Sequence, residues 1–199
     1  MILQELNDIP SAAIPVVELG RQLSMGTGFA DEGSQNEFLE ALLRAAIAQI
    51  EARTGKALIA RGFAMELTDW RDPGCQTLPI APVSAVTALI TRDRQGNATQ
   101  HDPSSVVLVA DAMRPQLQAR TGALPPIPWQ GVGRIEFIAG FGPGWNDVPA
   151  DLAQAVLMQA AHLYEHRGMA DATAAQGLAP GVGALIARWR VVRLIGERP

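Results

Sequence analysis

The chain has 199 residues, 48% of them hydrophobic and 18% charged, a composition typical of a folded domain and not of a disordered segment. Its formal net charge of −4 argues against a protein that holds DNA phosphates over its whole surface, although DNA can slide past such a protein. Cys75 is the only cysteine, which excludes an intrachain disulfide and indicates a reducing compartment, and no signal segment or apolar run of ~20 residues is found.

The first third of the chain is predicted to be helical. Residues 1–14 are mixed in character and are expected to form a loosely held arm, and residues 15–23 a short helix. A long helix is predicted over residues 34–54, ended by Gly55, with Glu40 and Arg44 paired at i,i+4. Its apolar side chains recur at helical spacing and form one face: Phe38, Leu39, Leu42, Leu43, Ala46, Ile47 and Ile50.

The period then changes to that of strands. Phe63, Met65 and Leu67 alternate with small or polar residues, which predicts a strand. Further strands are predicted at residues 78–80, 83–91, 106–109, 117–120 and 134–139, with a hairpin turn at 93–97. Three prolines around Trp129 predict a rigid loop.

A second long helix is predicted over residues 149–167. Pro149 suits the first turn, Asp151 faces the positive end of the helix dipole, and Gly168 ends the helix. Residues 169–183 show no apolar period and predict a mobile linker. A last helix is predicted over residues 184–195. Its apolar side chains share one side of the helix: Leu185, Ile186, Trp189 and Val192. The same helix carries Arg188, Arg190 and Arg193.

These elements predict an α+β fold. The long helices at about 34–54 and 149–167 form a small helical bundle, an antiparallel β region of about residues 57–140 is inserted between them, and the C-terminal helix is peripheral. Residues 1–168 are expected to form a single domain. Residues 169–199 are expected to add a flexible linker and a docking segment.

Residues 162–166 read His-Leu-Tyr-Glu-His and match the H-x-x-E-H pattern of inverted zinc peptidases. His162 and His166 share one helix face, so they are candidate zinc ligands, with Glu165 as general base. However, no third ligand follows at the expected spacing, and the motif falls on the last helical turn. The interpretation we favour is a polar edge on a buried helix, with no catalytic residue, metal or cofactor assigned.

The C-terminal residues favour a partner-binding role. Trp189 is the predicted anchor in a partner, with Arg188, Arg190 and Arg193 as its charged rim, although a solvated helix face explains the arginines equally well. Leu185, Ile186 and Val192 complete the apolar side. If the segment docks on a partner, truncation after Gly183 removes docking and leaves the fold intact. If it is a final core helix, the same truncation unfolds the protein.

Three blocks of sequence occur in a characteristic order, at residues 45–58, at 78–86 with the turn at 93–97, and at 137–142 followed by the helix at 148–167. Together they span about residues 35–168. In this order and spacing the chain resembles the head–tail connector (adaptor) proteins of long-tailed phages, prophages and gene transfer agents.

The resemblance implies a structural protein of the neck of a virion or phage-like particle, assembled in the bacterial cytoplasm, with no enzymatic activity and no cofactor. Copies are expected to form a closed ring, a dodecamer, that binds the portal protein, extends the DNA channel and docks a stopper or tail-completion protein. Double-stranded DNA is expected to pass through the lumen without sequence-specific binding, and no membrane is involved. Two alternatives stay open: a zinc-dependent hydrolase built on His162, Glu165 and His166, and a bacterial regulatory module unrelated to particles.

Overall fold

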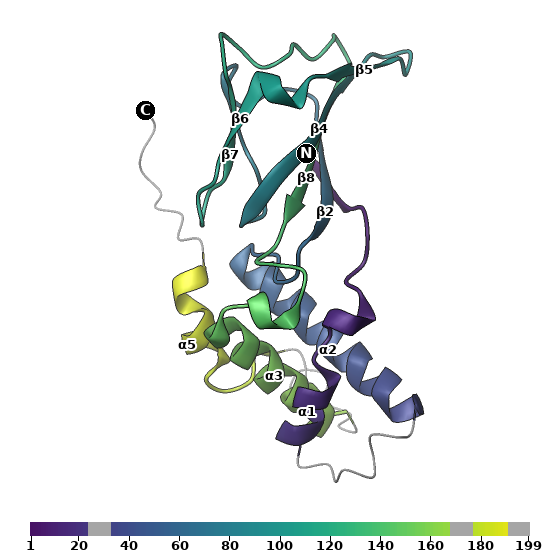
Figure 1. Cartoon of the computed structure of the whole chain (residues 1–199), viewed down its shortest axis with the longest axis vertical. Coiled ribbons are helices and arrows are strands. Elements are labelled where there is room, and N and C mark those ends of the chain that lie inside the picture. Colours follow the sequence, from purple (N-terminus) through teal and green to yellow (C-terminus); the bar gives the residue numbers. More distant parts are fainter. Residues whose placement is uncertain (24–32, 168–176, 191–199) are drawn as a thin grey trace. The chain divides into compact units, whose positions relative to one another are not determined.

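The computed structural model describes residues 1–23, 33–167 and 177–190. The chain divides into two compact units (Figure 1). The β unit comprises Met1–Ile9 and Ile59–Pro143, and the helical unit comprises Pro10–Leu58 and the chain from Gly144 onward. The fold class is therefore α+β, with the antiparallel β region between the two long helices, as the sequence predicts.

The described residues of the helical unit form the helices α1 (Val16–Gln22), α2 (Gly33–Thr54), α3 (Ala150–Glu165) and α5 (Val182–Ile186). α2 packs against α3, α1 contacts both of them, and α5 lies against α3 (Figure 1). Pro149 stands immediately before α3, and Asp151 lies in its first turn, as predicted. No helix in the described part of the chain is long and apolar enough to cross a membrane.

The apolar face of α2 forms much of the core of this unit. Leu39, Leu43, Ala46, Ile47 and Ile50 are buried, in keeping with their helical spacing. Two residues of the predicted face depart from the pattern. Leu42 is half-buried, and Phe38 is 41% exposed and meets the ring of Tyr164 at 6.2 Å between centroids. On the other side of the helix Arg44 Nη2 lies 2.7 Å from Glu40 Oε1, so the predicted ion pair is confirmed.

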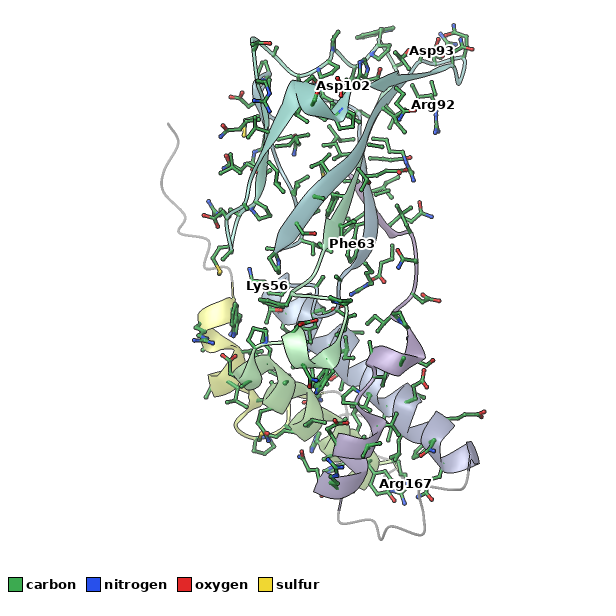
Figure 2. All side chains as sticks on the ribbon, in the orientation of Figure 1. Lys56, Phe63, Arg92, Asp93, Asp102 and Arg167 are labelled. Carbon is green, nitrogen blue, oxygen red and sulfur yellow. The ribbon has the colours of Figure 1, made fainter. Side chains whose placement is uncertain are left out.

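The β unit contains eight strands in two antiparallel sheets. The five-stranded sheet has the order β1-β2-β8-β4-β5, and the three-stranded sheet the order β3-β7-β6. The strands are β1 (Ile2–Glu5), β2 (Arg61–Leu67), β3 (Cys75–Thr77), β4 (Val83–Arg92), β5 (Ala98–His101), β6 (Val106–Val109), β7 (Gln116–Ala119) and β8 (Val132–Ala139). Arg92 and Asp93 mark the end of β4 at its hairpin turn into β5 (Figure 2).

Strand alternation places the core of the larger sheet on one face. Phe63 and Met65 of β2 are fully buried, and so are Ile135 and Phe137 of β8. Phe63 (labelled in Figure 2) and Phe137 are directly opposite in the register. Their rings stack at 5.9 Å between centroids. Because cross-strand aromatic pairs stabilise a sheet, this pair holds its two central strands in register.

The sequence prediction for the β unit requires three corrections. The N-terminal arm predicted over residues 1–14 is not loose, because β1 pairs with β2 and Glu5 forms an ion pair with the buried Arg61. The strand predicted at residues 78–80 lies instead at Cys75–Thr77, ahead of Pro79 and Pro82. β5 was not predicted, since its residues show no apolar alternation and only pairing with β4 defines it.

The two ends of the β region are joined to each other. Ile59 and Gly142 form a parallel bridge, and the Ala60 N–H donates to the Gly142 carbonyl at 2.8 Å. Gly140, with φ of +136°, allows this approach, because a Cβ there would collide with the backbone of Ala60.

The C-terminal part of the prediction is only partly covered by the described residues. Residues 168–176 of the predicted linker and residues 191–199 lie outside them. The described helix α5 runs over Val182–Ile186 and is followed by a 3-10 turn, Ala187–Trp189, so it begins two residues before the predicted start at Ala184. The predicted division into a single domain of residues 1–168 and a docking segment stays a prediction.

We expect Leu43→Asp to lower the free energy of unfolding by several kcal/mol, because Leu43 is fully buried in the helical unit and an unpaired carboxylate there is costly. Chemical denaturation of the purified variant measures the change. Ala45→Asp adds the same charge to the exposed side of α2 and should leave stability nearly unchanged. Equal stability of the two variants would show that the Leu43 face is accessible to water.

Candidate assembly surface

The residues predicted to bind a partner lie on α5 and the chain that follows it. Leu185 and Ile186 belong to α5, Arg188 and Trp189 to the 3-10 turn, and Arg190 comes directly after this turn. Val192 and Arg193 lie outside the described residues. The five described positions therefore gather at one end of the helical unit.

This segment presents two different sides. Ile186 is 1% exposed in a helix that contacts α3, so its side chain helps to hold α5 on the helical unit. Leu185 and Trp189 are half-buried, whereas Arg188 and Arg190 are exposed. The side available to a partner is accordingly more basic and less apolar than the sequence pattern alone predicts.

A clasp centred on Asp151 attaches the 3-10 turn to the start of α3. The indole Nε1–H of Trp189 donates to Asp151 Oδ2 at 2.7 Å, and Arg188 Nε lies 2.7 Å from the same oxygen. The other oxygen, Oδ1, accepts the backbone N–H of Leu152 at 3.0 Å. Both carboxylate oxygens thus have donors, and the negative charge lies in the first turn of α3, where the helix dipole favours it.

The clasp is sensitive to acid. Burial raises the pKa of Asp151, but hydrogen bonds from Trp189 and Arg188 together hold this pKa below its ordinary value of 3.8. A carboxyl group whose pKa is lower in the folded state stabilises that state above its ordinary pKa. The contribution is therefore complete above about pH 4 and is lost as the pH falls through the lowered pKa.

A buried glutamine secures the chain just before α5. Gln159 of α3 is fully buried, and its Nε2 donates to Gln49 Oε1 at 2.8 Å and to the Gly177 carbonyl at 3.1 Å. Its Oε1 accepts the Ala179 N–H at 2.8 Å. One side chain thus joins α3, α2 and the chain entering α5, and the described part of the predicted linker is hydrogen-bonded to the helical core.

An open groove lies between the start of α3 and the outer side of α5. Its volume is about 540 Å³, and it is lined by Ala150, Asp151, Ala184, Leu185, Ala187 and Arg188. Three of these residues are alanines, so the groove has a small-residue, mainly apolar floor. At its wall Arg188 and Asp151 pair with each other, and the Arg188 guanidinium lies over the Trp189 ring at 4.7 Å. The groove is therefore suited to a flat apolar group.

The histidine motif forms a close pair at the end of α3. The rings of His162 and His166 lie 4.1 Å apart between centroids, and His166 Nδ1 donates to the His162 carbonyl at 2.8 Å. Glu165 is exposed. Beside the motif, Arg167 (Figure 2) stacks over the Tyr164 ring at 3.9 Å. Among the described residues no cluster of three or more histidine, cysteine or acidic side chains is arranged to hold a metal ion.

Sequence reasoning did not assign a role to Trp129. The predicted rigid loop places this side chain 87% exposed, a higher exposed fraction than that of any other large hydrophobic residue in the described ranges. The signal was present in the sequence as a tryptophan among prolines, but only the structure shows that the indole points to solvent.

Comparison with solved structures gives several matches, including three that each cover 100% of both chains. The chain is 49% identical, with a TM-score of 0.89, to a chain of the neck of an empty GTA particle computed with C6 symmetry. It is 49% identical, with a TM-score of 0.85, to a chain of the virion of a native gene transfer agent (GTA) particle. It is 45% identical, with a TM-score of 0.84, to a chain of the neck of a native GTA particle computed with C12 symmetry. No protein-family model and no curated protein matches the chain.

We expect Asp151→Ala to release the 3-10 turn from α3, because Trp189 and Arg188 both lose their acceptor. The free energy of unfolding should fall by about 1–2 kcal/mol, and amide hydrogen exchange of residues 182–190 should become faster. Glu165→Ala removes an exposed carboxylate from the same helix and serves as the control. Unchanged exchange in Asp151→Ala would show that the apolar contact of α5 alone holds the segment.

Proposed function

The chain belongs to the neck proteins of gene transfer agent particles, and we propose that within the neck it is the head–tail connector. The observation that carries the proposal is similarity over the full length of a neck protein, at close to half of all positions. Both units of the fold are included in that match, so the proposed role rests on the entire chain and not on one shared domain.

A ring of copies is part of this proposal. The related necks are computed with C6 and C12 symmetry, which fits a dodecamer around the axis of the particle. A ring with rotational symmetry requires each copy to present two different surfaces to its two neighbours. A connector of this kind extends the DNA channel below the portal protein and offers its far side to a stopper or tail-completion protein.

The role is structural and not enzymatic, as the membership of a particle neck implies. The net charge of −4 suits a channel through which double-stranded DNA moves without being held, since counterion release drives DNA binding to basic surfaces. We therefore assign no sequence-specific DNA contact to this chain.

The C-terminal segment is the part proposed to bind the portal. Residues 177–199 contain four arginines, Arg188, Arg190, Arg193 and Arg198, against one acidic residue, Glu197. Because the whole chain has a net charge of −4, the residues before this segment carry more acidic than basic side chains. Arg190 is exposed and comes directly after the 3-10 turn that the clasp holds, and Val192 and Arg193 follow it in the sequence. A basic segment of this kind fits an acidic surface of the portal.

The observed packing changes how portal binding is best tested. Truncation after Gly183 removes Ile186 and Trp189, which hold α5 on α3, so it tests folding together with docking. Truncation after Arg190 retains the clasp and removes only residues 191–199. We expect this protein to keep its melting temperature and to lose binding to purified portal in a pull-down assay.

Arg190→Glu should weaken the same binding, because it reverses an exposed charge at the start of the proposed docking segment. Arg114→Glu reverses an exposed charge in the β unit and is the matched control. Full portal binding by both the truncated protein and Arg190→Glu would contradict the assignment of this segment.

The rival function is a zinc-dependent hydrolase, which the proximity of the His162 and His166 rings favours. We expect purified protein to hold well under one zinc ion per chain in elemental analysis, because two imidazoles leave a tetrahedral site incomplete. His101→Ala is the control for histidine removal elsewhere. One tightly held zinc per chain, lost in His166→Ala but not in His101→Ala, would support the hydrolase.

A further inference from the structure

Trp129 is an unusual residue to leave in water. Its side chain is 87% exposed, although tryptophan offers one of the largest apolar surfaces of any residue and is enriched at the energetic centres of interfaces. Scattered exposed valines or leucines need no explanation. A tryptophan with almost no intramolecular cover is typical of an anchor for another molecule.

The loop that carries Trp129 is held firmly at both ends. Before it, the Trp70 indole Nε1–H donates to the Pro125 carbonyl at 2.7 Å. After it, the Gly131 N–H donates to the Pro128 carbonyl at 2.8 Å. Gly131 also fits closely, since a Cβ there would collide with the carbonyl oxygen of Arg92. The prolines fix the backbone between these points, so binding through Trp129 costs little loop entropy.

The composition of the loop favours a protein partner over DNA. Residues 121–133 contain no charged side chain, and a phosphate-binding loop requires arginine, lysine or a series of free N–H groups. Three prolines within this loop remove backbone donors as well. The loop is therefore built to enter an apolar site.

The helical unit of the same chain carries a site with matching properties, namely the groove between α3 and α5. Its volume of about 540 Å³ accommodates an indole ring, and Ala150, Ala184 and Ala187 leave its floor open. Arg188, 68% exposed, stands at the wall, where its Nε lies 2.7 Å from Asp151 Oδ2 and its guanidinium lies over the Trp189 ring at 4.7 Å, so an entering indole would meet this fixed pair.

We propose that Trp129 of each copy binds in the α3–α5 groove of the neighbouring copy, and that this knob-and-groove contact joins the copies around the neck. The inference rests on the proposed ring, because closed rotational symmetry needs two different and complementary surfaces on each copy. The described residues provide both, an exposed aromatic knob at Trp129 and an open groove of suitable size. This contact does not involve the residues from Arg190 onward, which are proposed above to bind the portal.

The direct test is disulfide cross-linking in assembled particles, with Cys75→Ser as the background. Trp129→Cys combined with Ala187→Cys places one thiol on the knob and one in the groove. On mild oxidation we expect a ladder of cross-linked species extending to the full ring, and only dimers when the two single variants are mixed. Each single variant alone, and the pair Val107→Cys with Ala187→Cys, should give no ladder, since Val107 is exposed on a surface outside the contact.

A second measurement uses no cysteine. Trp129→Ala should keep the melting temperature of the wild-type chain, because the side chain buries little surface in one copy. It should reduce the yield of particles with complete necks roughly tenfold or more, as expected for a central interface tryptophan. Val17→Ala removes another exposed apolar side chain and should assemble normally.

The outcomes separate the inference from the proposed function. Wild-type yield for Trp129→Ala, or no ladder from the knob-and-groove pair in particles that contain the chain in their neck, overturns the contact and leaves the connector role intact. A cross-link confined to single chains also overturns it. Absence of the wild-type chain from purified necks overturns the connector role itself.

Discussion

The packing of α2 on α3 is the interaction on which the rest of the structure depends. The two helices are separated in sequence by the whole β unit, yet they share one core, in which Leu43 and Ile47 are buried on α2 and Leu152 and Val156 on α3. Such a core exists only if the chain returns after the insertion. The parallel bridge between Ile59 and Gly142 brings the two ends of that insertion together within the β unit. The chain therefore leaves the helical unit and returns to it at neighbouring positions.

The same core determines where the C-terminal segment begins. Gln159 lies near the centre of α3, and its side chain forms hydrogen bonds with Gln49, Gly177 and Ala179. A buried amide of this kind is costly to leave unpaired. It therefore fixes the path of the chain into α5. Asp151, two turns earlier on α3, then fixes the path out of it through Trp189 and Arg188. One helix thus orients a segment that sequence analysis treats as independent of the core.

Both units contribute to the proposed assembly. The β unit supplies a rigid loop with an exposed aromatic residue, and the helical unit supplies a groove and a basic segment. None of these features requires chemistry beyond packing, hydrogen bonding and charge. This agrees with membership of a particle neck. A symmetric assembly needs contacts that repeat around an axis, whereas an enzyme needs reactive groups gathered at one site.

Periodicity in the sequence was sufficient to predict the fold class, both long helices and most strands. The helical spacing of Leu39, Leu43 and Ile47, and the alternation of Phe63, Met65 and Leu67, are local patterns that report which side of an element faces the core. Local patterns do not report partners that are distant in sequence. β1 and β5 were missed because their residues show no clear alternation, and they are strands only through pairing with β2 and β4.

The features of the candidate surfaces also fall into two groups, those visible in the sequence and those decided by the tertiary structure. The basic, tryptophan-containing C-terminus and the proline loop were visible in the sequence, since they depend on residue type alone. The exposure of Trp129, the burial of Ile186 and the groove beside Arg188 were decided only by the tertiary structure. The reason is physical: whether a side chain faces water depends on what packs against it, and the residues that pack against α5 lie on α3, with Asp151 meeting Trp189 across 38 positions of sequence.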